Sequence, residues 1–303
     1  MDKRIISVAV TGGIHTPTMS EYLPYKPEDI ARHAIDSWRE GAAVVHIHAR
    51  DPNDGRPSSD INLFKEIVER IRNESDMIIA ISTGGGAQMT LEERLSAIPA
   101  LKPELASFNQ GSINFGLFPL LQKHDTWKHD WEPELLNFTR DWVFKNTFEE
   151  LEGIAKMMKD YGTKPELEVY DTGMLYNVQY LHNLGLLEEP LYIQFVTGIL
   201  GGLQSNPFDL MNFYNTAERI FGHGNFVWSI IGAGRQQFNM TTMGLILGGN
   251  IRVGLEDNLY LEKGVLAKSS AEQAAKMVRI MKELGLEPAS PEDAREMLNI
   301  KKK

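Results

Sequence analysis

Residues 43–50 read AVVHIHAR, and the interpretation of the fold begins with this stretch. A short, continuous apolar run rich in valine and isoleucine is typical of a parallel strand that is buried on both faces. His46 and His48 interrupt the run, and strand alternation places both imidazole rings on the same side. Taken alone, the pair fits half of a zinc site and equally fits two hydrogen-bonded histidines in a core.

Seven similar runs flank this one at regular intervals. They occupy residues 5–12, 77–84, 104–110, 166–173, 191–198, 226–234 and 250–257. Amphipathic helical patterns lie between them, as in residues 26–41, where Pro27 suits the first turn and Gly41 suits the position after the last. The alternation predicts an α/β fold, a (β/α)8 TIM barrel that forms a single domain over residues 1–303. An open doubly wound sheet is the competing architecture, but it rarely contains so many even units.

One connection is much longer than the others. Residues 111–146 follow the fourth predicted strand and are rich in aromatic side chains. Loops of this length usually cover an active site, bind a ligand or contact another subunit. We therefore expect a long insertion in the barrel, either a lid or an oligomer contact built on Trp127, Trp131 and Trp142.

Composition narrows the range of functions. The chain contains no cysteine, which excludes disulfides, thiolate metal sites and a cysteine nucleophile. The net charge of −10 argues against nucleic acid as a partner, because phosphate binding needs a basic surface. No apolar run approaches the ~20 residues of a membrane span. Residues 1–13 fit a strand better than a signal peptide, so we expect a cytoplasmic protein without a membrane partner.

In this fold the active site lies at the carboxyl ends of the strands, where the second and eighth predicted strands carry polar residues. On the eighth strand, Arg252 and Glu256 share one face. A buried carboxylate without a partner is costly, whereas a metal-bound one is not. His46, His48 and Glu256 together make the ligand set of a catalytic zinc with an open fourth position. The alternative is a structural ion pair that joins Arg252 to Glu256 or Asp257 and closes the barrel.

Other strand ends give weaker signals. The STGGG sequence of residues 82–86 permits close backbone approach to a ligand, although a plain turn is the simpler interpretation. Ser107 and Asn109 share a face of the fourth strand, and Glu168 on the fifth is either a partner of a metal-bound histidine or a structural acid. The GAGR sequence that ends at Arg235 fits a phosphate-binding loop and equally an ordinary turn.

Four motifs in this order resemble the β-keto acid cleavage enzymes, among which the 3-keto-5-aminohexanoate cleavage enzyme is the named example. They are HIHAR at residues 46–50, ISTGGG at 81–86, the asparagine- and glycine-containing segment 109–116, and IRVGLEDN at 251–258. The resemblance runs almost from end to end. It implies a TIM barrel that converts a β-keto acid and acetyl-CoA into acetoacetate and a new acyl-CoA, commonly as a homotetramer.

The resemblance also implies roles for individual residues. His46, His48 and Glu256 fall on the ligands of a divalent metal, usually zinc. Substrate contacts fall on Ser82, Gly85 and Ser107, and we expect Asn109, Ile14 and His15 to line the same site. The catalytic group falls on Arg252, Asp257 and Ser82. Because arginine stays protonated far above neutral pH, Arg252 is either an unusual base or an electrostatic clamp, and Asp257 is the more ordinary base.

One position departs from the aminohexanoate enzyme, which has an acid where this chain has Ile14. That acid would suit a substrate ammonium group, and an isoleucine cannot pair with a cation. The neighbouring His15 could meet an anion or a hydroxyl group. We therefore predict a β-keto acid whose side chain is neutral or acidic, with the amino substrate a poor one.

Two other function classes compete with this one. A metal-dependent hydrolase of the amidohydrolase type also has a histidine pair, but on the first strand, with further histidines after strands five and six that this chain lacks. The remaining histidines other than His15 fall in helical or loop segments, and we predict them at the surface; they are His33, His124, His129, His182 and His223. A barrel that only binds a partner would have lost site residues, and here the full set is present.

Overall fold

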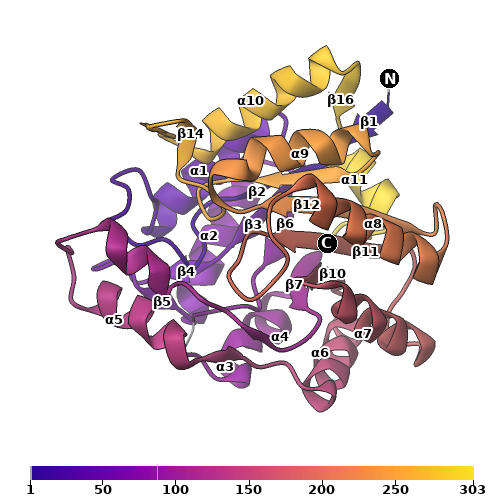
Figure 1. The fold of residues 1–303 in the computed structure, drawn as a ribbon, viewed down its shortest axis with the longest axis horizontal. Helices are drawn as coiled ribbons and strands as arrows, with labels where there is room; N and C mark the ends of the chain where they lie inside the picture. The colour runs from indigo at the N-terminus through magenta and orange to yellow at the C-terminus, as the bar shows by residue number, and fades with distance from the viewer. Residues whose placement is uncertain (1, 87) are drawn as a thin grey trace.

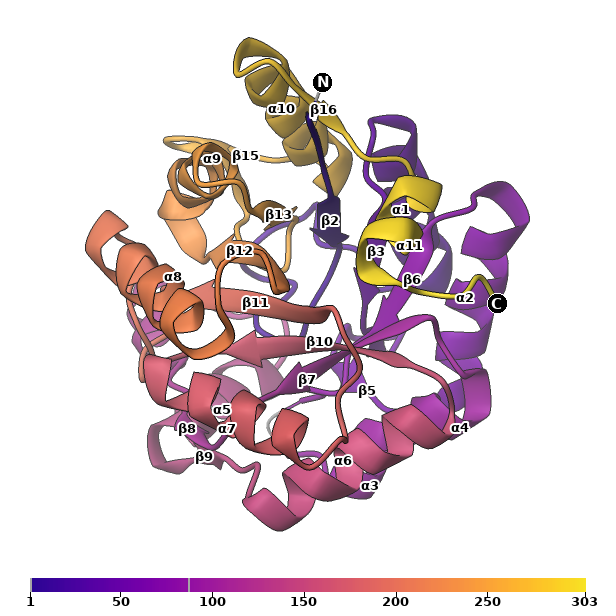
Figure 2. The ribbon, with the colours of Figure 1, turned by 90° about the vertical axis from the view of Figure 1, so that its right-hand side faces the viewer.

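Eight parallel strands close into a barrel in the computed structural model, which describes residues 2–86 and 88–303. In chain order they are β2 (Ile6–Ala9), β3 (Val44–Ile47), β6 (Ile78–Ile81), β7 (Leu105–Asn109), β10 (Lys164–Val169), β11 (Leu191–Thr197), β12 (Phe226–Gly232) and β13 (Asn250–Val253). Each pairs with the next, and β13 pairs with β2 to close the ring. Figure 2 shows this ring with helices outside it. The predicted (β/α)8 barrel is confirmed, because every predicted run overlaps one barrel strand.

The helices follow the predicted units closely. They are α1 (Pro27–Arg39), α2 (Ile61–Glu74), α3 (Leu91–Leu95), α4 (Ala97–Leu101), α5 (Trp131–Phe138), α6 (Phe148–Asp160), α7 (Thr172–Asn183), α8 (Pro207–Phe221), α9 (Gln237–Ile246), α10 (Ser270–Glu283) and α11 (Pro291–Leu298). Residues 91–101 form two short helices, α3 and α4, which meet at Ser96. Pro99 explains the break, because it has no N–H for the carbonyl of Leu95 and its ring clashes with that carbonyl.

Local sequence sets where the helices begin and end. Pro27 is the first residue of α1, and Gly41 follows its C-cap with a φ of 103°, as predicted. The N-terminus of α6 is fixed by a capping box in which Thr147 and Glu150 each bind the other's backbone N–H. None of the helices in residues 2–86 and 88–303 is long and apolar enough to span a membrane.

One predicted surface residue is buried. His33 on α1 is 6% exposed, so the prediction that it lies at the surface is wrong. The helical repeat explains the error, since His33 lies three residues after Ile30 and next to Ala34, on the face of α1 that packs on its neighbours.

The amino-terminal mouth of the barrel is closed by both ends of the chain. The short strand β1 (Asp2–Arg4) pairs in parallel with β16 (Leu286–Pro288), which precedes α11. Ala294 and Leu298 of α11 join an apolar cluster with Val44 and Ile78 at the start of the strands. Figure 2 shows α11 in yellow in front of β3 and β6. This end of the barrel is therefore filled, and the opposite end remains for ligands.

The segment 111–146 forms an extra layer at that opposite end. It contains an antiparallel pair, β8 (Ile113–Asn114) with β9 (Val143–Phe144), two short 3₁₀ turns, η1 (Phe118–Lys123) and η2 (Thr139–Asp141), and the helix α5. In Figure 1 it lies far from α11, beside the hairpin formed by β4 (Ala49–Arg50) and β5 (Pro57–Ser58). The other small elements are η3 (Gly234–Gln236) and the hairpin β14 (Tyr260–Glu262) with β15 (Val265–Leu266).

Candidate metal centre and active site

A pocket of about 630 Å³ opens at the carboxyl ends of the barrel strands. Its wall includes residues that follow β2, β3, β6, β12 and β13, together with Phe115, Leu120 and Trp142 of the insertion. Among the predicted site residues, the lining contains Ile14, His15, His46, His48, Ser82, Gly85, Asn109, Arg252, Glu256 and Asp257. The insertion therefore forms part of the pocket wall.

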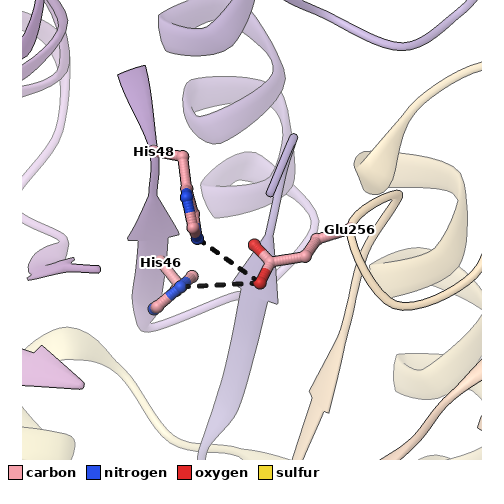
Figure 3. A group of neighbouring side chains, drawn as sticks. All are labelled: His46, His48 and Glu256. Atoms are coloured by element: carbon pink, nitrogen blue, oxygen red, sulfur yellow. Dashed lines mark ion pairs between the residues drawn. The ribbon is translucent and has the colours of Figure 1, made fainter. Parts of the chain in front are cut away.

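Two imidazoles and one carboxylate meet at the base of this pocket. His46 Nε2 and His48 Nε2 each lie 3.6 Å from Glu256 Oε1. One ligand atom from each residue lies within 4.8 Å of the others, and all three residues are buried. Figure 3 shows both rings turned toward Glu256, which reaches across from the loop after β13. The sequence thus brings together the three predicted ligands from opposite ends of the chain.

Two glycines make room for this arrangement. Gly254 has a φ of 137°, and a Cβ atom there would lie 2.0 Å from the carbonyl oxygen of Ala9. The chain after β13 can therefore pass against β2 only with glycine at this position. Gly12 has a φ of 62°, and its Cβ atom would lie 2.3 Å from Cγ of Glu256. Both glycines allow the Glu256 side chain to enter the pocket.

Arg252 organises the acids of the site. Its Nε and Nη2 donate to Asp257 in a bidentate fork at 3.0 and 2.9 Å, and Nη2 also donates to Glu256 Oε1 at 2.8 Å. Its Nη1 donates to Glu168 and to Gln194, both at 3.4 Å. The ion pairs expected as the alternative to a metal site are thus both present, and Glu256 faces Arg252 and the histidines at once.

Buried negative charge exceeds buried positive charge around this arginine. Burial raises the pKa of Glu168 to about 8 and that of Glu166 to about 7, and it raises that of Asp257 to about 6. Burial also opposes ionisation of Glu256, but the nearby positive charge, chiefly that of Arg252, outweighs it and holds the Glu256 pKa well below its usual range. Burial lowers the pKa of His46, which keeps the ring in the neutral form that binds metals.

These residues fit a divalent cation. Two neutral imidazoles and an ionised carboxylate are a common donor set for zinc in catalytic sites. Among the described residues, Glu256 Oε2 is buried without a hydrogen-bond partner, so a lone pair faces the site unused. Two positive charges would also offset the surplus of buried carboxylates.

The predicted substrate contacts divide into two groups. Ser82 and Asn109 line the pocket, and Ser82 Oγ accepts a hydrogen bond from Gly84 N at 3.1 Å. Ser107 is 1% exposed and lies outside the lining. Its Oγ accepts from Thr83 N at 3.1 Å, so it supports the loop after β6, and its own substrate contact stays a prediction.

Arg50 supports the loops beside the site without lining the pocket, and sequence reasoning missed it. It is fully buried, and its guanidinium donates to the carbonyl oxygens of Gly55, Thr11 and His15. His15 is held in turn, because its Nδ1 donates to the carbonyl oxygen of Leu255 at 2.8 Å. The signal was present, since strand alternation places position 50 on the same face as positions 46 and 48.

Residues 3–300 match the beta-keto acid cleavage enzyme family. The chain belongs to this family. It is 46% identical to the 3,5-dioxohexanoate:acetyl-CoA acetone transferase of Paraburkholderia graminis over 99% of this chain and 96% of that protein. It is 38% identical to the 3-keto-5-aminohexanoate cleavage enzyme of Acetoanaerobium sticklandii over the full length of both.

Solved structures support the fold of this β-keto acid cleavage enzyme. The ternary complex of ObcA with a C4-CoA adduct and oxalate superposes with a TM-score of 0.68, over 92% of this chain and 68% of that one, at 22% identity. The predicted family is confirmed. Neither the hydrolase nor the non-catalytic barrel is supported by the match.

Proposed function

We propose that this enzyme converts a β-keto acid with an uncharged side chain and acetyl-CoA into acetoacetate and a new acyl-CoA. The observation that carries the proposal is the cluster of His46, His48 and Glu256 beside the Arg252–Asp257 fork, at the base of a pocket. A divalent ion, zinc in the first instance, would be held by the first three residues. Bound there, it would supply a Lewis acid that stabilises the enolate of the substrate.

The reaction balances without a further reagent. Loss of a C2 proton from the β-keto acid gives an enolate, whose C2 forms a bond with the acetyl carbonyl carbon and releases CoA as thiolate. The thiolate then attacks the original ketone carbon. The bond between C2 and that carbon breaks, so that C2 leaves in acetoacetate, which regains a proton, and the rest of the acid leaves as acyl-CoA.

The residues of this chain supply the proton transfer and the charge. All five N–H groups of the Arg252 guanidinium point to acceptors, and guanidinium groups do not lose their proton in proteins. Arg252 therefore acts as a fixed positive charge beside the enolate. Asp257 is the base that removes the C2 proton, and Ser82 orients the substrate from the loop after β6.

The pocket residues around Ile14 determine which substrate side chain the enzyme accepts. This residue packs against the apolar cluster that contains Met19, Leu255 and Leu259. At this position the chain has no acid to match the one in the aminohexanoate enzyme. The P. graminis relative is named for 3,5-dioxohexanoate, a β-keto acid with an uncharged side chain. We propose 3,5-dioxohexanoate as the first substrate to test.

Three further features complete the proposal. Arg235 and Lys123 line the pocket and would meet the phosphates of CoA. By family resemblance, the enzyme is a homotetramer; that it acts in the cytoplasm stays a prediction from its sequence. Light scattering after size exclusion tests the tetramer directly.

The deciding experiment measures acetoacetate formed by the zinc-loaded enzyme from a panel of β-keto acids, with and without acetyl-CoA. We expect product only with acetyl-CoA, and the largest kcat/KM for an uncharged side chain. If no acid yields acetoacetate while zinc is bound in stoichiometric amount, the proposed reaction is wrong.

A further inference from the structure

A polar layer lies inside the barrel beneath the proposed catalytic groups. Interior layers of such barrels are usually filled by branched apolar side chains. Here Glu166 of β10, Gln194 of β11 and Ser229 of β12 occupy neighbouring strands, and each is at most 1% exposed. Burying polar groups is unfavourable unless they are hydrogen-bonded, so this layer needs an explanation.

The amide of Gln194 can take only one orientation in this layer. Its Nε2 donates one hydrogen to Glu166 Oε1 at 2.9 Å and the other to Ser229 Oγ at 3.0 Å. Both donors of the amide are then used. If the amide turned over, its NH2 group would face Nη1 of Arg252, and two donors would repel each other.

The locked amide presents its oxygen to Arg252. Gln194 Oε1 accepts from Arg252 Nη1 at 3.4 Å, next to the contact of the same nitrogen with Glu168. The opposite edge of the guanidinium forms the fork with Asp257. Because a guanidinium is planar, holding the Nη1 edge fixes the plane in which the fork lies.

We propose that Gln194 is a positioning residue that orients the Arg252 guanidinium toward Asp257 and the substrate. The inference rests on the proposed function, because Arg252 needs an orientation only if it stabilises the enolate. Gln194 itself does not reach the pocket lining and has no predicted contact with substrate. Its effect is therefore on the proton-transfer step and not on the binding of acetyl-CoA.

The test compares Gln194→Met with the wild type, since methionine has a similar length and cannot hydrogen-bond in the same way. We would measure exchange of the C2 protons of the β-keto acid with deuterium oxide, without acetyl-CoA, and then kcat and KM for both substrates. Loss of a supporting partner typically costs roughly 10- to 100-fold in activity. We expect that loss in exchange and in kcat, with the KM for acetyl-CoA and the zinc content unchanged.

Two further variants keep the test decisive. Ser229→Ala removes one of the two acceptors with little change in volume, and we expect a smaller loss of the same kind. Tyr192→Phe is the control for the layer as a whole, because the buried Tyr192 hydroxyl lies beside Ser229 and Ser7 and, within residues 2–86 and 88–303, has no hydrogen bond to Gln194 or Arg252. Its removal should leave exchange and kcat unchanged.

The outcomes separate the two proposals. If the wild type neither exchanges C2 protons nor forms acetoacetate, the proposed function fails and the role of Gln194 fails with it. If the wild type is active and Gln194→Met exchanges at the same rate, only the positioning role is overturned. A loss that comes with lost zinc or a matching loss after Tyr192→Phe also overturns it, because it indicates a purely structural layer.

Discussion

His48 Nε2 lies 3.6 Å from Glu256 Oε1, and each proposed metal ligand contributes one side chain. The metal proposal can therefore be tested by changing one side chain at a time. We expect His48→Ala to lose bound zinc and at least about 100-fold of activity, because two ligands rarely hold a catalytic metal. Zinc per chain after dialysis, measured by mass spectrometry, checks this. His223→Ala is the control, since its side chain is 86% exposed and lies far along the chain in the loop after α8. Full zinc retention in His48→Ala would contradict the ligand set.

Ile14 tests the substrate proposal at the same scale. We expect Ile14→Glu to raise kcat/KM for 3-keto-5-aminohexanoate about tenfold or more, through a charge-assisted hydrogen bond to the ammonium group. The same change should lower kcat/KM for 3,5-dioxohexanoate, because it places a carboxylate against the apolar Met19 and Leu259. Ile14→Gln matches glutamate in size without its charge. If kcat/KM for the amino substrate rose equally in Ile14→Gln, or did not rise in Ile14→Glu, position 14 would not select substrates by charge.

For single residues, the sequence predicts those positions that follow from the strand and helix repeats. His46 and His48 share a face because strands alternate, and Arg252 and Glu256 lie at the carboxyl end of the last strand, so their meeting follows from barrel topology. Gln194 could not be assigned its role from sequence, because that role depends on contacts with Glu166 and Arg252 from two other strands. Strand alternation also places Arg50 on the face of His46 and His48, so its burial could be predicted from the sequence.

At the scale of elements, the insertion shows where sequence reasoning stopped. Its length predicted a lid, a binding loop or a subunit contact, and the structure shows that Phe115 and Trp142 line the pocket. Its attachment is invisible in the sequence. The fully buried Glu132 of α5 accepts hydrogen bonds from Thr18 N and Oγ1, both at 3.0 Å, and from His129 N at 3.1 Å. These contacts tie α5 to the loop after β2.

We therefore expect Glu132→Ala to loosen the insertion while the barrel stays folded. Each buried donor left without a partner costs roughly 1–3 kcal/mol, so the segment should open locally. The readouts are faster proteolysis within residues 111–146 and a higher KM, with little change in zinc content. Glu134→Gln, an exposed acid on the same helix, should behave as the wild type. Unchanged proteolysis of Glu132→Ala would show that α5 is held by apolar packing alone.

At the scale of the whole molecule, the barrel was predictable because eight apolar runs alternate with helical patterns, and each run became one barrel strand. The closure of the amino-terminal end of the barrel could not be predicted from the sequence. The pairing of β1 with β16 joins the two ends of the chain, and only three residues of each strand take part. Such short strands carry too little pattern to be recognised in sequence.

This closure gives a prediction about acid stability. Lys3 Nζ lies 2.7 Å from Asp293 Oδ1, and Asp293 also accepts from the N–H and hydroxyl of Ser290 in a capping box. The hydrogen bond from Lys3, followed by those from Ser290, lowers the pKa of Asp293 to about 2. Since an unfolded aspartate titrates near 4, this carboxylate stabilises the fold above about pH 4. The contribution is lost as the pH falls from about 4 toward 2.

We expect Asp293→Asn to lower the free energy of unfolding by about 1 kcal/mol at pH 7, the usual loss for a helix-capping partner. The difference from the wild type should narrow steadily below pH 4, because the wild-type carboxylate is then protonated too. Urea unfolding of both proteins at pH 7, 5, 4 and 3 measures this difference in the free energy of unfolding. Glu296→Gln, which changes an exposed acid on the same helix, is the control. A difference that stays constant down to pH 3 would mean that the ionised Asp293 does not hold the ends of the chain together, and that the apolar contacts of α11 do so alone.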